Sequence, residues 1–110
     1  MINTNSSNQR NFMNLIGEKI RKDVNNEVRL LLLIANELYR KDRVSSYRNF
    51  CKKYLQKNSN LLNVLIYNDK KPSISVLLSL YLKLNQEKLL PYWQQKLSFC
   101  LLNKAMKGQR

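Results

Sequence analysis

The chain has 110 residues, of which 44% are hydrophobic and 25% charged, a composition typical of one folded domain with its own core. Lys and Arg number 20 against 7 Asp and Glu, and His is absent, so the net charge is +13. The lack of His excludes Ser–His, Cys–His and zinc–His sites, and we expect no enzyme activity, cofactor or metal. The positive excess favours a polyanionic partner, of which nucleic acid is the commonest.

The sparse chain breakers predict an all-α fold. Only two glycines and two prolines occur in a leucine-rich sequence. Residues 1–10 are polar and without period, so we expect a disordered arm. Residues 11–110 are predicted to form a single bundle of five to six helices. Because Cys51 and Cys100 stand far apart in apolar patterns, they are expected to be reduced thiols in a cytoplasmic protein.

The N-terminal half predicts two helices. One begins at Asn11, with Phe12, Ile16 and Ile20 recurring every four residues. The other, Glu27–Lys41, is apolar nearly all round, which is typical of a helix in the middle of a bundle or at a subunit contact. The longest apolar run, Leu30–Ala35, is too short to span a membrane, and from the polar start we expect no signal peptide.

Three short helices and a longer one follow. They are predicted over Ser46–Leu55, Ser59–Asn68, Ser73–Asn85 and Pro91–Lys107. Ser59 and Ser73 are candidate N-caps, the second directly after Pro72. The last helix is expected to bury one stripe of side chains, namely Trp93, Leu97, Cys100, Leu101 and Met106.

Positive charge gathers in the second half of the chain. Residues 1–44 hold eight basic and five acidic side chains, a net +3, whereas residues 45–110 hold twelve and two, a net +10. Two short helices joined by a tight polar turn and flanked by lysines are the usual device for placing one helix in a DNA groove. Cations around the helix over Ser59–Asn68 are expected to contact phosphates, and they are Arg48, Lys52, Lys53, Lys57, Lys70 and Lys71.

The same helix carries candidate base-reading side chains. Asn60 and Asn63 can pair with adenine N6 and N7, and Leu61 can touch a thymine methyl. The full set of residues predicted to contact bases is Ser59, Asn60, Leu61, Asn63 and Tyr67.

A resemblance supports this interpretation. The run Leu65–Leu80, LIYNDKKPSISVLLSL, resembles the end of the recognition helix, the basic loop and the fourth helix of phage-repressor domains of the Cro/CI (XRE) type. Upstream, Phe50-Cys51 resembles the Leu-Ala pair at their helix crossing, and the resemblance covers Ser45–Gln86. Two positions depart from that pattern, because Gln56 and Asn68 stand where the family carries glycine in a left-handed conformation.

We therefore predict a helix-turn-helix over residues 45–86 in a phage-type or prokaryotic transcription regulator. It would bind double-stranded DNA in the cytoplasm, associated with the nucleoid, and as a homodimer through the Leu30–Ile34 segment or the Trp93 helix. RNA stays open as a ligand because Tyr47, Tyr54 and Tyr67 could stack on bases. Two other classes also stay open. One is a basic structural subunit of a ribonucleoprotein, and the other is an inhibitor that occupies a partner's nucleic-acid groove.

Overall fold

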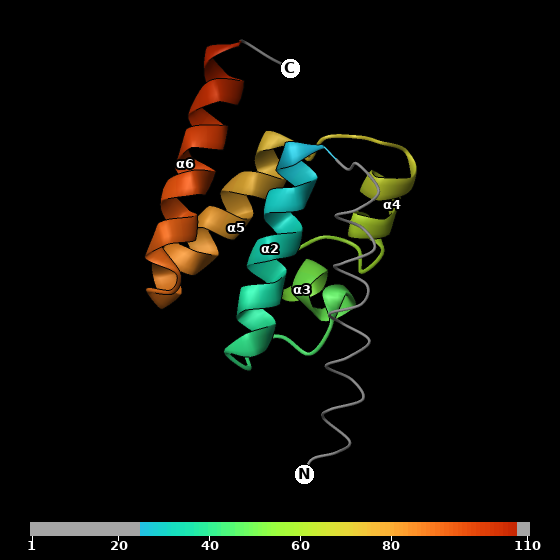
Figure 1. Ribbon diagram of the computed structural model, residues 1–110, viewed down its shortest axis with the longest axis vertical. Helices are drawn as coiled ribbons and strands as arrows, with labels where there is room; N and C mark the ends of the chain where they lie inside the picture. The colour runs from blue at the N-terminus through green and yellow to red at the C-terminus, as the bar shows by residue number, and fades with distance from the viewer. Residues whose placement is uncertain (1–24, 108–110) are drawn as a thin grey trace.

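A computed structural model describes residues 25–107 of the chain, and in that part the protein is all-helical, without strands (Figure 1). The predicted arm and the predicted helix beginning at Asn11 lie outside these residues. None of the described helices is long and apolar enough to cross a membrane. The five helices are α2 (Asn26–Arg40), α3 (Tyr47–Lys53), α4 (Leu61–Tyr67), α5 (Ile74–Glu87) and α6 (Pro91–Met106).

Helix α2 is the central element of the bundle, as its wide apolar surface predicts. Its side chains Val28, Leu31, Leu32 and Leu38 are fully buried. The helix begins where the Asn25 side-chain oxygen accepts a hydrogen bond from the backbone N–H of Val28, at 2.9 Å.

The alternative role predicted for this helix, a subunit contact through Leu30–Ile34, is wrong for most of that segment. Leu30, Leu31, Leu32 and Ile34 are all buried within the chain. A second copy could not reach them without opening the core.

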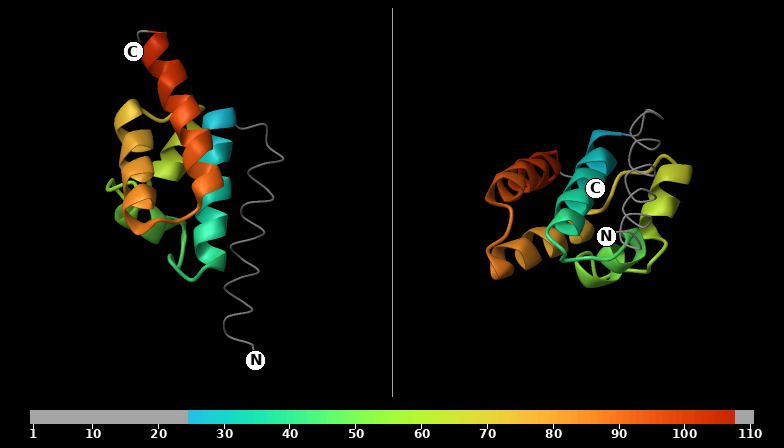
Figure 2. Two further views of the ribbon diagram at one scale, coloured as in Figure 1. Left: turned by 90° about the vertical axis from the view of Figure 1, so that its left-hand side faces the viewer. Right: turned by 60° about the horizontal axis from the view of Figure 1, so that its bottom comes forward.

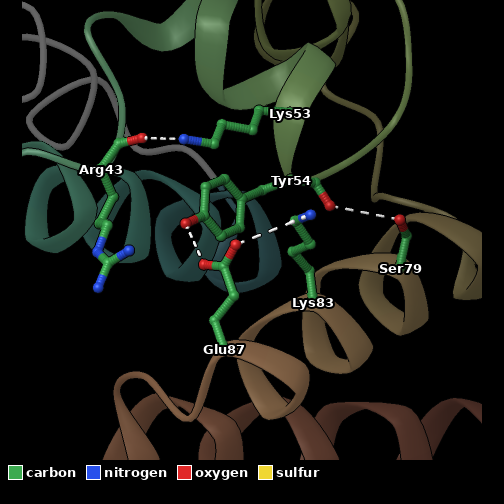
Figure 3. A network of polar contacts seen from close by, with 6 residues as sticks. All are labelled: Arg43, Lys53, Tyr54, Ser79, Lys83 and Glu87. Atoms are coloured by element: carbon green, nitrogen blue, oxygen red, sulfur yellow. Dashed lines mark hydrogen bonds and ion pairs between the residues drawn. The ribbon is translucent and has the colours of Figure 1, made fainter.

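A polar network joins α3 to α5 beneath the buried side chain of Tyr54 (Figure 3). The Tyr54 hydroxyl donates to Glu87 Oε1 at 2.5 Å, and Glu87 Oε2 lies 3.8 Å from the ammonium of Lys83. Ser79 Oγ donates to the backbone carbonyl of Tyr54 at 3.3 Å. The end of α3 is therefore fixed to α5 at two positions, Ser79 and Glu87, and Lys83 supports the second from within α5.

Left-handed residues follow four of the described helices, although none of them is glycine. Gln56, in the turn after α3, has φ 55°, so the left-handed conformation expected at this position is present. After α4 the left-handed residue is Asp69 (φ 51°), whereas Asn68 has φ −96°, so the prediction for Asn68 is wrong by one residue. The shift follows from the Lys70 N–H, which donates to the Leu65 carbonyl and closes the helix one residue later.

Helices α5 and α6 form a hairpin (Figure 2). Ser73 caps α5 by accepting from the Val76 N–H at 3.3 Å, as predicted, and Pro91 starts α6. Leu97 of α6 is fully buried, but Met106, predicted to be buried, is 76% exposed. At about 100° per residue, Met106 lies on the side of α6 opposite Leu97. The C-terminal end of α6 also projects beyond α2 and α5 (Figures 1 and 2).

Candidate nucleic-acid interface

Helix α4 lies at the edge of the molecule, on the side opposite to α6 (Figures 1 and 2). It packs against α2 and α3, and its buried side chains are Leu62 and Leu65. Residues three and four positions apart share a helix face, so the outward face is a single patch. That patch, called the α4 face below, consists of the exposed residues Asn60, Asn63, Val64 and Tyr67.

The turn before α4 places its first residues differently from the prediction. Asn58 Oδ1 accepts from the Asn60 N–H at 2.8 Å, and the Asn58 carbonyl accepts from the Leu61 N–H at 3.0 Å. Ser59 is part of this Asx-type turn and not of the helix, so the helix begins at Leu61 with Asn60 at the N-cap position. Ser59 is therefore not the N-cap, and it lies half-buried in the turn.

Leu61, predicted to touch a thymine methyl, is half-buried against the core. The thiol of Cys51 lies close to it, where burial raises the thiol pKa and the backbone amides of Leu62 and Leu61 oppose that rise. Val64, which is 46% exposed, takes the outward position instead. The sequence contains the signal for Val64, because residues 60, 63, 64 and 67 follow helical spacing.

Exposed cations lie on both sides of the α4 face in the chain. Arg48 and Lys52 are on α3, Lys57 is in the turn before α4, and Lys70 and Lys71 follow it. At a rise of about 1.5 Å per residue, a helix as short as α4 is only about 10 Å long, so the turn and the loop are close neighbours in space.

The sixth predicted cation, Lys53, is already engaged within the chain (Figure 3). Its ammonium donates to the Arg43 carbonyl at 2.8 Å and lies 5.7 Å from the centre of the Tyr54 ring. A phosphate contact would have to replace both interactions. Lys53 is therefore better placed to stabilise the bundle than to bind phosphate.

The loop after α4 is fixed to the start of α2. Asn25 Nδ2 donates to the backbone carbonyl of Lys70 at 3.2 Å, while the oxygen of the same amide caps α2. Asp69, one of two acidic residues after position 44, lies in this loop next to Lys70. The other, Glu87, is engaged with Tyr54 and Lys83. Between positions 45 and 71, the chain on either side of the α4 face thus carries six basic side chains and one acidic side chain.

Metal ligands and thiols are the remaining candidate reactive groups in the described residues. Among positions 25–107, no three His, Cys, Asp or Glu side chains lie together as a metal site requires. Cys51 and Cys100 are free thiols, and burial raises the pKa of each, which lowers the fraction of reactive thiolate.

Over residues 25–107 the protein is all-helical, and its helix α4 presents the α4 face outward among basic side chains. Residues 31–98 match a family of unknown function, DUF6626, and the match spans more than half of the chain. The protein belongs to that family. Comparison with curated proteins and with solved structures gives no match.

Proposed function

We propose that the protein is a non-enzymatic, helix-turn-helix DNA-binding regulator, in which α3 and α4 form the motif and α4 enters the major groove. The observation that carries the proposal is the α4 face, where two carboxamides point outward between cations that precede and follow the helix. The left-handed Gln56 between α3 and α4 supports it, because helix-turn-helix connections commonly need such a residue.

Base reading would fall to the α4 face. The carboxamides of Asn60 and Asn63 can each form two hydrogen bonds with an adenine edge, and the exposed methyl groups of Val64 can contact the methyl of thymine. Tyr67, which is 79% exposed at the end of the helix, is placed to contact the sugar–phosphate backbone or a base edge. Ser59 and Leu61 lie beside or beneath this face and would hold α4 in position.

Phosphate binding would come from five cations: Arg48, Lys52, Lys57, Lys70 and Lys71. Each neutralised phosphate of a DNA duplex contributes about −0.9 to the slope of log affinity against log salt concentration. Five contacts therefore give a slope of about −4.5. A regulator of this kind would act in the cytoplasm on nucleoid DNA.

The test is a fluorescence-anisotropy titration of labelled DNA at several salt concentrations. Target sequences would first be selected from a random duplex pool. Lys52→Ala combined with Lys57→Ala should weaken binding to every duplex alike and bring the slope to about −2.7. Asn60→Ala combined with Asn63→Ala should reduce only the preference for the selected sequence.

Lys88→Ala is the matched control, because Lys88 is an exposed lysine in the turn between α5 and α6, away from α4 (Figure 1). It should leave both the affinity and the preference nearly unchanged. A flat salt dependence, or equal losses from the control and the α3–α4 lysine variants, would reject the proposal. Tighter binding to RNA in the same assay would instead identify a ribonucleoprotein subunit, and a protein partner retained after nuclease treatment would identify an inhibitor.

A further inference from the structure

Helix α6 carries a second apolar stripe, on the side away from its core contacts. The stripe, called the α6 seam below, consists of Tyr92, Phe99, Leu102 and Met106, which are 58%, 59%, 55% and 76% exposed. The stripe that faces the core is centred on the fully buried Leu97. At 100° per residue, the seam is centred almost directly opposite Leu97. An apolar stripe that no other part of residues 25–107 covers is the usual mark of an interaction surface.

The spacing of the seam is that of a coiled coil. Tyr92, Phe99 and Met106 are seven residues apart, and Leu102 and the exposed Gln95 occupy the intervening positions. In heptad notation these residues fill consecutive a and d positions over two heptads. A seam of this kind fits a second helix of similar spacing better than a flat surface or a small molecule.

We infer that the partner is a second copy of this chain, which pairs through the α6 seam in an antiparallel arrangement with Phe99 and Leu102 at the centre. The flanks of the seam suit a self-contact, because they are Lys96, Ser98, Asn103 and Ala105 and contain a single charge. That charge already has a partner, since the Lys96 ammonium lies 5.3 Å from the centre of the Tyr92 ring. A chain of net charge +13 can approach its own copy most easily at such a surface.

Electrostatics also selects the antiparallel direction. Opposed helices cancel their dipoles, whereas parallel helices align them. With the axis midway between Phe99 and Leu102, the two copies of Lys96 are nine residues apart along the helix, or about 14 Å. Because α6 projects beyond the bundle (Figures 1 and 2), the two positive bodies then lie at opposite ends of the pair. A parallel pair would place those bodies side by side.

The size of the seam indicates a modest affinity. Four side chains that are more than half exposed offer about 400 Å² of apolar surface per copy, if each contributes roughly 100 Å². The total of about 800 Å² is below the range of stable interfaces. We therefore expect a concentration-dependent dimer with a Kd on the order of micromolar, independent of whether α4 binds DNA.

Sedimentation equilibrium tests the surface. The whole chain should shift from monomer to dimer over the micromolar range. Phe99→Glu and Leu102→Glu should each raise the Kd at least tenfold with an unchanged helical circular dichroism spectrum. Tyr67→Glu, which places the same charge on an exposed aromatic of α4, is the control and should dimerise like the original chain. A monomer throughout this range, or dimerisation that survives both seam variants, would overturn the inference.

Cysteine cross-linking tests the direction. In a Cys51→Ala, Cys100→Ala background whose dimerisation is first shown to be intact, Phe99→Cys and Leu102→Cys should each form disulfide dimers under mild oxidation. Tyr92→Cys should not, because its two copies would lie about 25 Å apart along the pair. Equal cross-linking at all three positions would indicate a parallel pair and overturn the proposed arrangement.

Discussion

Replacement of Tyr54 by Phe removes one hydroxyl from the joint between α3 and α5. That hydroxyl donates to the Glu87 carboxylate at 2.5 Å from a fully buried side chain. Hydrogen bonds to charged groups contribute about 1.5–3 kcal/mol. Because the Glu87 side chain is 24% exposed and also faces Lys83, water can partly replace the lost donor. We therefore expect the lower end, a loss of about 1.5 kcal/mol in the free energy of unfolding.

The assay is urea unfolding followed by circular dichroism. A loss of that size corresponds to a decrease in Tm of roughly 7 °C for a chain of this length. In a Glu87→Ala background the same replacement should cost under about 0.5 kcal/mol, since the acceptor is gone. Tyr81→Phe is the matched control, because that half-buried tyrosine on α5 forms no hydrogen bond to another described side chain. An equal effect of Tyr54→Phe in both backgrounds, or an equal effect of Tyr81→Phe, would refute the reasoning.

Three further predictions concern stability. Lys88→Gly should stabilise the protein by about 0.5–1 kcal/mol, since Lys88 ends α5 with φ 57° and glycine adopts that conformation without strain. As the control, Gln86→Gly inside the same helix should lower the free energy of unfolding by about 1 kcal/mol in the same urea assay. Burial raises the pKa of Cys51 above 9.0, and burial together with the Glu87 bond raises the pKa of Tyr54 above 10.0. Both groups therefore contribute fully to stability below those values, and their contribution is lost as the pH rises through the higher folded-state pKa values. The free energy of unfolding should be lower at about pH 10.5 than at about pH 8, and this difference should be smaller in Tyr54→Phe. Asn25→Ala should cost about 1 kcal/mol by removing the α2 cap, whereas Asn25→Asp should keep the cap, lose only the bond to Lys70, and speed amide exchange in the loop after α4.

Local patterns predicted most of the helices because their signals lie within a few residues. The apolar surface of α2 indicated its central place, and Ser46 and Ser73 both accept the capping hydrogen bonds that begin α3 and α5. The outward direction of Asn60 and Asn63 also followed from spacing, since Leu62 and Leu65 fix the buried side. Alternation of buried and exposed positions on a short helix is a property of the sequence itself.

Two of the features that the sequence did not predict depend on a distant residue. Lys53 looks like any other surface lysine until the α2–α3 loop places the Arg43 carbonyl beside it. The pairing of Tyr54 with Glu87 spans 33 residues and has no local signal. The error at Met106 was one of local spacing: at about 100° per residue it lies on the side of α6 opposite the fully buried Leu97, so it could not belong to the buried stripe. The seven-residue spacing of Tyr92, Phe99 and Met106 is visible in the sequence. Only the exposure of all three side chains in the structure distinguishes the α6 seam from a stripe that packs in the core.

The shortness of α4 bears on how the interface would work. A helix of seven residues is far below the length at which isolated helices are stable in water, so its orientation depends on its supports. Those supports are Leu62 and Leu65 in the core, the Cys51 thiol beneath its first turn, and the bond from Asn25 to the following loop. Loss of a support would misplace the entire α4 face, and it should weaken sequence-specific binding more than the phosphate contacts of α3. Variants of Asn60 and Asn63 would lower sequence preference without loss of stability, whereas Leu62→Ala would lower both together. That difference separates residues that read DNA from residues that hold the reading helix.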